Sequence, residues 1–250
     1  MTGIVHRPGE GEALFGGRIV LKAALPDLTI TESWFQSAGG GAVPHLHHEH
    51  ADSFYVLEGE LAFLLHDEEH VLGPGASVSV PPGVVHGFRN LTPARFLNFH
   101  TPDGGFADNL RARDRGELGG FDSVDVEPGS GLPPTDALVL RAGEGEQLAG
   151  NHRVARFLAG SSELSLIELE LEPAFSGPEP HHHTDHTDSF YVLGGTVEVT
   201  LDSERVVAGP GTFVAATPGV EHTFTSGPGG GRLLNIHAPS TGFHDRFRAM

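Results

Sequence analysis

The sequence predicts an all-β protein made of two tandem barrels, and three observations carry this prediction. The chain of 250 residues contains a domain-sized internal repeat. Its apolar segments are short, rich in Val, Leu and Phe, and bounded by Gly and Pro, a pattern typical of strands joined by turns. Helix signals are confined to one short segment near the end of each repeat. Many short strands at regular spacing favour a closed antiparallel barrel or a jelly roll.

The repeat defines two units of similar length. The segment that begins at His45 recurs from His181, 136 positions later, and the same offset continues without a gap to His86 and His222. Each unit exceeds about 100 residues, which is enough for an independent core. Residues 114–136 are rich in Gly, Asp, Glu and Pro and predict a surface connection. We therefore expect one barrel in residues 1–125 and a second in residues 126–250.

Within the first unit, turn signals such as Gly-Pro, Pro-Pro-Gly and Thr-Pro separate the expected strands, and the second unit repeats the scheme. A helix is expected near the end of each unit, because apolar residues recur there about one turn apart and arginines follow, where the helix dipole favours cations. The expected strands are 53–57, 61–65, 76–80, 85–89 and 96–100, and the expected helices are 106–115 and 243–250.

Composition excludes several classes of partner. The formal charge is -18, from 33 acidic and 15 basic residues, and no basic stripe offsets it, so neither nucleic acid nor membrane is an expected partner. The sequence shows no basic-then-apolar signal segment, which makes the cytoplasm the expected compartment. Because the chain has no cysteine, a bound metal would need nitrogen and oxygen ligands. A homodimer is the one assembly that we keep open.

The histidine-rich segments resemble the two sequence motifs of the cupin superfamily. The first motif, H-x-H followed by a carboxylate and a glycine, is matched by His45, His47, Asp52 and Gly59, and in the second unit by His181, His183, Asp188 and Gly195. The second motif is matched by Gly75, Pro81, Gly83, His86 and Asn90, and in the second unit by Gly211, Gly219 and His222, with Thr217 and Ser226 as departures. The chain is therefore similar to a bicupin, with two double-stranded β-helix (jelly-roll) barrels.

This resemblance implies a metal site in each barrel. In an extended strand, residues two apart share a face, so His45 and His47 project together. Three imidazoles and a carboxylate suit a divalent first-row transition metal such as Fe, Mn, Ni, Co or Zn, with positions left for water or substrate. The expected ligands are His45, His47, Asp52 and His86 in the first barrel and His181, His183, Asp188 and His222 in the second.

The carboxylates depart from the family pattern, in which Glu is usual. Asp is shorter by about 1.5 Å, one carbon–carbon bond. Either the backbone moves inward, or Asp52 and Asp188 stand behind a three-histidine metal as hydrogen-bond partner or base. The neighbouring pairs Glu49/Asp185 and His50/His186 are alternative ligands or acid–base groups. For Glu49, His48 and His50, the place in a charged loop favours exposure, and we leave these three out of the expected site.

Two further sets of side chains are compatible with the pocket but stay open. Phenylalanines that share strand parity with the ligands either line the pocket or pack in the core. Polar residues that alternate with apolar neighbours face either the cavity or water. The first set is Phe54, Phe88, Phe190 and Phe224, and the second is Asn98, His100, Asn235 and His237.

Cupins include dioxygenases, decarboxylases, isomerases and binding proteins, so the fold does not fix the reaction. A small dianion would need an Arg or Lys clamp; Lys22 is the only lysine, and Arg89 is expected to point away from the metal. The phenyl groups instead favour a flat, apolar ligand. The leading hypothesis is a quercetinase-like dioxygenase acting on a phenolic or enolic small molecule, with Asp52 or Asp188 as catalytic base. The alternatives are a non-catalytic sugar- or carboxylate-binding cupin and a metal-dependent isomerase or lyase.

Overall fold

The computed structural model describes residues 3–249 and divides the chain into two compact units, each built almost entirely of antiparallel strands. The all-β prediction is confirmed. The first unit is Gly11–Glu144, and the second combines the chain from Gly145 onward with residues up to Glu10. This division differs from the expected halves 1–125 and 126–250. The reason is strand pairing: β1 (Ile4–His6) pairs with β19 (Phe213–Ala216), whereas β13 (Leu138–Leu140) pairs with β9 (Ser77–Val80).

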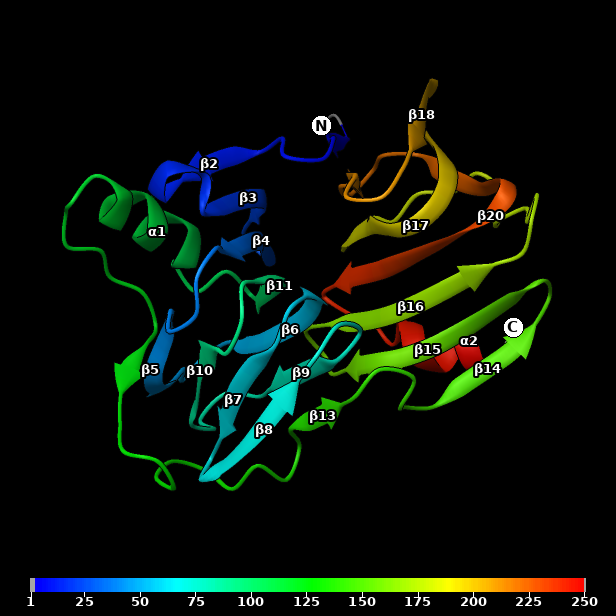
Figure 1. Ribbon diagram of the computed structural model, residues 1–250. Coiled ribbons are helices and arrows are strands. Elements are labelled where there is room, and N and C mark those ends of the chain that lie inside the picture. The colour runs from blue at the N-terminus through cyan, green and yellow to red at the C-terminus, as the bar shows by residue number, and fades with distance from the viewer. Residues whose placement is uncertain (1–2, 250) are drawn as a thin grey trace. The chain divides into compact units, whose positions relative to one another are not determined.

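The first unit contains two sheets (Figure 1). The seven-stranded sheet has the order β13-β9-β6-β11-β4-β3-β2, and the five-stranded sheet has the order β12-β5-β10-β7-β8. The remaining elements of this unit are β2 (Glu12–Leu14), β3 (Ile19–Leu25), β4 (Leu28–Phe35), β5 (Gly41–Leu46), β6 (Ala51–Glu58), β7 (Leu61–Leu65), β8 (Glu68–Leu72), β10 (His86–Asn90), β11 (Ala94–Thr101), α1 (Phe106–Asp114) and β12 (Val124–Asp125), with a 3-10 turn at Phe15–Gly17.

The second unit repeats this plan with longer strands. β17 (Thr187–Leu201) corresponds to β6 and β7 together, and β20 (His222–Ala238) corresponds to β10 and β11. These two strands pair along most of their length and join the whole unit into one sheet of order β1-β19-β17-β20-β16-β15-β14, with β18 paired to β17. The other elements are β14 (Gln147–Gly150), β15 (Arg153–Gly160), β16 (Ser165–Leu171), β18 (Glu204–Ala208) and α2 (Phe243–Arg248).

Each unit buries its own apolar core. Alternate residues of a strand face one side of its sheet, and Phe54 and Val56 of β6 accordingly pack with Phe63 of β7 and Phe96 of β11. The second unit reproduces this core around Phe190 of β17. Burial of these side chains provides the main stabilisation of each unit.

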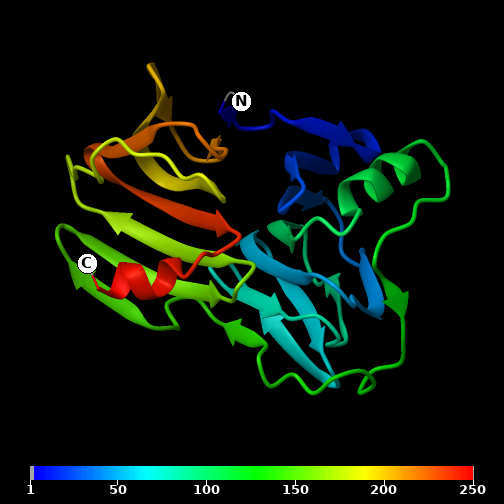
Figure 2. The ribbon, with the colours of Figure 1, turned by 180° about the vertical axis from the view of Figure 1, so that it is seen from behind.

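The expected strands and helices are confirmed, with shifts of one or two residues at their ends. Each helix follows a glycine in the left-handed region, Gly105 (φ 85°) and Gly242 (φ 74°). Helix α2 lies against β15, where Phe247 contacts Phe157 (Figure 2). Position 250, the end of the expected second helix, lies outside the described residues. Between residues 3 and 249, no helix is long and apolar enough to cross a membrane.

Candidate metal centres

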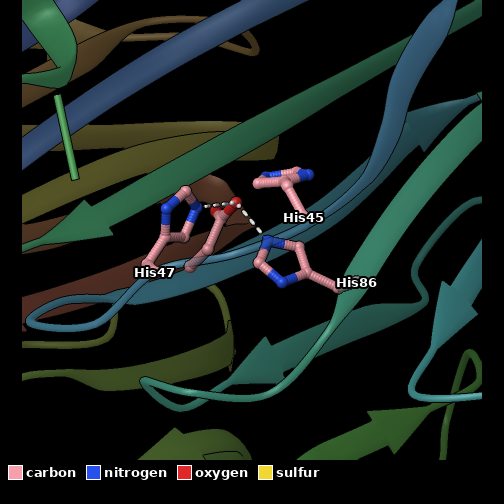
Figure 3. Close-up of side chains that lie close together, drawn as sticks. His45, His47 and His86 are labelled. Carbon is pink, nitrogen blue, oxygen red and sulfur yellow. Dashed lines mark hydrogen bonds and ion pairs between the residues drawn. The ribbon is translucent and has the colours of Figure 1, made fainter. Parts of the chain in front are cut away.

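The first candidate centre draws its residues from both sheets of the first unit. His45 of β5 lies directly opposite His86 of β10 in the antiparallel register, and Asp52 begins the inward face of β6. The Asp52 Oδ2 atom is 3.2 Å from His86 Nε2 and 3.7 Å from His47 Nε2. Figure 3 shows the rings of His45, His47 and His86 close together. One potential ligand atom from each of the four residues lies within 4.8 Å of the others.

The second candidate centre has the same geometry. The Asp188 Oδ2 atom is 3.1 Å from His222 Nε2 and 3.8 Å from His183 Nε2. An isolated bridge between His181 and His222 repeats the register of His45 and His86. One potential ligand atom from each of these four residues again lies within 4.8 Å of the others. The structure therefore brings together the eight residues that the sequence singled out, in two sets of four.

Backbone carbonyls fix the orientation of the imidazoles. His86 Nδ1 lies 3.1 Å from the Val84 carbonyl oxygen, and His222 Nδ1 lies 3.0 Å from that of Val220. His45 Nδ1 is held in the same way, 2.8 Å from the Val43 oxygen. Because a carbonyl only accepts, Nδ1 carries the proton in each ring, and the Nε2 lone pair is left to face the cluster.

The donor atoms fit a metal ion. His47 Nε2 and His183 Nε2 are buried and have no hydrogen-bond partner among the residues that the structure describes. A buried nitrogen without a partner is costly, and coordination would satisfy it. Three imidazole nitrogens and one carboxylate oxygen form a set that binds divalent first-row metals.

The protonation states also suit ligation. Burial, together with the neighbouring His86 and His47, lowers the pKa of His45 to about 4. For Asp52, burial raises the pKa, but His100, His47 and His86 outweigh it and hold the pKa well below its usual range. The pKa of Asp188 is lowered in the same way. At neutral pH His45 is therefore neutral and both carboxylates are ionised, which are the forms that bind metal.

A buried hydrogen-bonded network lies beside each carboxylate. Asn98 donates from Nδ2 to Asp52 Oδ1, and His100 Nε2 lies 3.0 Å from Asn98 Oδ1. His100 Nδ1 lies 3.0 Å from His50 Nε2. The second unit repeats these contacts with Asn235, His237 and His186, at 2.6, 3.2 and 3.0 Å.

This network answers one question that the sequence left open and corrects one expectation. Asn98 and His100, like Asn235 and His237, face the site rather than water. The expected exposure of His50 is wrong, since this ring is buried. It stacks on His47 with centroids 4.0 Å apart. His48 and Glu49 are exposed as expected.

Sequence reasoning missed Phe121 and Asp122, which belong to the segment expected to be a surface connection. The Asp122 carboxylate accepts hydrogen bonds from the backbone N–H groups of His48 (2.9 Å) and Glu49 (2.6 Å). Its carbonyl oxygen lies 2.5 Å from His47 Nδ1, and the Phe121 ring packs 5.6 Å from the His47 ring. This segment has no apolar periodicity, so no sequence signal pointed to the contact.

The two centres consequently differ in how far their histidines are shielded from solvent. The His47 side chain is 1% exposed, whereas that of His183 is 18% exposed. In the second unit, His186 Nδ1 pairs instead with Asp185 at 2.8 Å, and the Asp185 side chain is 68% exposed. The first centre is therefore the more enclosed of the two.

Each centre opens into a cavity with aromatic walls. The cavities measure about 660 Å³ in the first unit and about 700 Å³ in the second. Phe54 and Phe88 line the first, and Phe190 and Phe224 line the second, so these rings do reach the pocket. Arg89 points elsewhere, to Glu69, as expected. Three pocket arginines, Arg18, Arg113 and Arg153, were missed; for Arg18 and Arg153, the matching positions before or at the start of β3 and β15 were the available signal.

The two departures from the second motif do not touch the candidate centre. Ser226 Oγ accepts from Phe175 N at 2.8 Å and donates to the Glu172 carbonyl at 2.6 Å. Asn90 plays the matching structural part in the first unit, accepting from Gly40 N at 2.7 Å. Neither Ser226 nor Thr217 lines the second cavity. Ser226 and Asn90 thus tie strands to neighbouring turns.

Comparison with known proteins agrees with this geometry. Residues 34–100 and 167–237 each match the family model described as "Cupin domain". The chain is 24% identical to quercetin 2,3-dioxygenase of Bacillus subtilis, over 98% of this chain and 84% of that protein. Among solved structures, protein Ylba from E. coli is similar with a TM-score of 0.68 at 12% identity, covering 95% of this chain and 91% of that one. A salicylate 1,2-dioxygenase variant from Pseudoaminobacter salicylatoxidans gives 0.62 at 14% identity, covering 89% and 74%.

Proposed function

The chain belongs to the cupin domain family, and from that premise we propose that it is a metal-dependent dioxygenase that cleaves an enolic or phenolic small molecule with molecular oxygen. The observation that carries the proposal is the joint presence, in one cavity, of a nitrogen- and oxygen-donor cluster and a wall of phenyl rings. Such a cavity suits a flat ligand with adjacent oxygen atoms at one end.

In this proposal each unit holds one divalent metal. His45, His47, His86 and Asp52 would hold it in the first unit, and His181, His183, His222 and Asp188 in the second. When bound, the metal would supply Lewis acidity toward a substrate oxygen and a redox partner for oxygen. The backbone carbonyls that hold the imidazoles fix the position of the donor atoms before the metal arrives.

The carboxylate has a second task, as acceptor of the phenolic or enolic proton. Asn98 occupies Oδ1 of Asp52, so Oδ2 is the oxygen that faces the cluster and the cavity. Asn235 leaves Asp188 Oδ2 in the same position. Asn98 holds Asp52 in one orientation, and its neighbours keep it ionised at neutral pH, which is the form that can receive a proton.

The phenyl rings favour this reaction over chemistry on a sugar. A sugar pocket needs free donors and acceptors along its walls. Near the centre the main polar candidates are Asn98, His100 and His50, and these already bond to one another. Phe35, Phe54, Phe88 and Phe96 form part of the wall of the first cavity, packed edge to face or stacked. This part of the wall is therefore apolar.

Metal analysis followed by an oxygen-uptake screen tests the proposal. Protein purified without chelator is assayed for bound metal, then loaded separately with Fe, Mn, Ni, Co and Zn. Oxygen consumption is measured against flavonols, catechols and diketones. We expect uptake with at least one redox-active metal and none with Zn. Metal-loaded protein that consumes no oxygen with any of these compounds, while binding a sugar, would replace this proposal with the binding-module or isomerase hypothesis.

A further inference from the structure

Arg153 is a cation in the second cavity without a counter-ion. It begins β15, is half-buried, and holds its guanidinium 4.4 Å above the centre of the Phe247 ring. No ion pair or side-chain hydrogen bond joins it to any other residue between positions 3 and 249. Burial lowers its pKa, although a guanidinium stays charged under all ordinary conditions. Removing a charge partly from water without a partner costs free energy, and an anionic ligand would offset that cost.

A continuous row of rings connects this arginine to the candidate metal centre. Phe247 lies 5.7 Å from Phe243, and Phe243 stacks on His237 at 3.6 Å. His237 Nε2 is in turn 3.4 Å from Asp188 Oδ1. All of these residues line the same cavity. A flat molecule lying along the rings would therefore meet the metal ligands at one end and Arg153 at the other.

The first unit repeats the arrangement with Arg18. This residue stands 135 positions earlier, immediately before β3, the strand equivalent to β15. Its guanidinium lies 5.3 Å from the centre of the Phe15 ring and 5.6 Å from that of Phe35, and it lines the first cavity. Arg18, too, has no ion pair within the described part of the chain. It is more exposed than Arg153, which makes Arg153 the stronger case.

Most other arginines of the chain are engaged. Arg95, Arg111 and Arg156 each pair with a glutamate. In the second cavity the ionisable residues other than histidine are Arg153 and Asp188, and the metal would neutralise the latter. The cavity thus presents one uncompensated positive charge in a protein whose formal net charge is -18.

We propose that the substrate carries an anionic group, a carboxylate, that pairs with Arg153 in the second cavity and with Arg18 in the first, while its phenolic or enolic oxygens face the metal ligands. This inference rests on the proposed function and narrows its substrate class to flat phenolic or enolic acids. The guanidinium presents two parallel N–H groups that match a carboxylate. The phenyl ring beneath it fixes that orientation without competing for the anion.

A pair of probes that differ only in charge tests the inference. The probes are 3,4-dihydroxycinnamate and its methyl ester, which share a catechol head. Zinc-loaded full-length protein is used, so that no oxygen chemistry intervenes, and dissociation constants are measured by calorimetry. We expect the acid to bind at least about tenfold more tightly than the ester, the effect of one charge-assisted contact.

Substitution of both arginines then shows how much of the preference for the acid over the ester depends on them. In the Arg18→Met/Arg153→Met variant we expect the acid and the ester to bind equally, with the ester unchanged; lysine at both positions should restore part of the preference. Arg205→Met is the matched control, because Arg205 is 74% exposed and lines neither cavity, and it should keep the wild-type ratio. Equal binding of both probes by wild-type protein, or an unchanged preference in the double variant, overturns this inference alone. Failure of both probes to bind zinc-loaded wild-type protein overturns the proposed function with it.

Discussion

The Nε2 atom of His50 lies 3.0 Å from the Nδ1 atom of His100, and the same separation joins His186 to His237. Because Asn98 Oδ1 can only accept, His100 donates to it from Nε2. The network therefore ends on Asn98 Nδ2, which donates to Asp52 Oδ1. One oxygen of the carboxylate is fixed by the network and the other is left for the cluster.

Replacement of His86 by alanine should remove the metal from the first centre only. His86 Nε2 is 3.2 Å from Asp52 Oδ2, and its loss leaves two imidazoles and one carboxylate. Metal analysis should give about one metal per chain instead of about two, because imidazole suits Fe, Ni and Zn better than carboxylate does, so the loss of one imidazole weakens binding most. The control is His70→Ala, because His70 lies on β8 outside both clusters. A full complement of metal in His86→Ala would contradict the assignment.

Replacement of Asp52 by asparagine, together with Asp188→Asn, should preserve metal but slow turnover. Three imidazoles remain, and asparagine can still accept from the neighbouring amide. Loss of the proton acceptor should lower the rate of oxygen consumption by about 100-fold or more. Metal content and oxygen uptake are measured on the same preparation. Loss of metal would instead show that the carboxylate is needed for binding, and unchanged turnover would exclude it as the base.

Sequence reasoning reached the donor clusters because their spacing is local. His45 and His47 share a face by strand alternation, and the repeat at His181 and His183 doubles the signal. The strands and both helices were likewise marked by turn residues on their borders. These features depend on short stretches of chain, and the structure follows them closely.

The parts that sequence missed depend on contacts between distant segments. Asp122 reaches the loop at His48 from more than 70 positions away, and its surroundings carry no apolar pattern. The charged neighbours of His50 favour an exposed ring, yet the ring is enclosed by His47 and Phe121. The pairing of β1 with β19 cannot be read from residue spacing either, because a short strand can pair with any sheet edge whose N–H and C=O groups are unpaired.

Acidification should weaken the metal-free fold before the carboxylates titrate. Burial lowers the pKa of His100 to about 3, with His50 and His47 adding to the effect. The unfolded chain takes up this proton near pH 6.5, whereas the folded chain stays neutral, so unfolding is favoured as pH falls below about 6.5. The lowered pKa of Asp52 contributes stability that is lost only below its ordinary value, 3.8.

The free energy of unfolding, measured in urea between about pH 6 and pH 4.5, should therefore fall with pH. In His100→Gln the slope should be shallower by about 1.4 kcal/mol per pH unit, the contribution of one proton. His70→Gln serves as the control. An unchanged slope in His100→Gln would show that this ring is protonated in the folded state. In metal-loaded protein, acid should in addition release metal as the ligand imidazoles protonate.

The two centres should lose metal to a chelator at different rates. Phe121 and Asp122 cover His47, whose side chain is 1% exposed, whereas that of His183 is 18% exposed. Zinc transfer to a coloured chelator should therefore show two phases of similar amplitude. His86→Ala should remove the slow phase and His222→Ala the fast one.

Loss of the ring in Phe121→Ala should accelerate the slow phase by about two- to tenfold, the effect of about 0.5 to 1.5 kcal/mol of aromatic packing on the barrier. Leu118→Ala, in the same segment but fully exposed, should leave both phases unchanged. A single phase in wild-type protein, or a slow phase insensitive to Phe121→Ala, would show that this segment does not control access to the first centre.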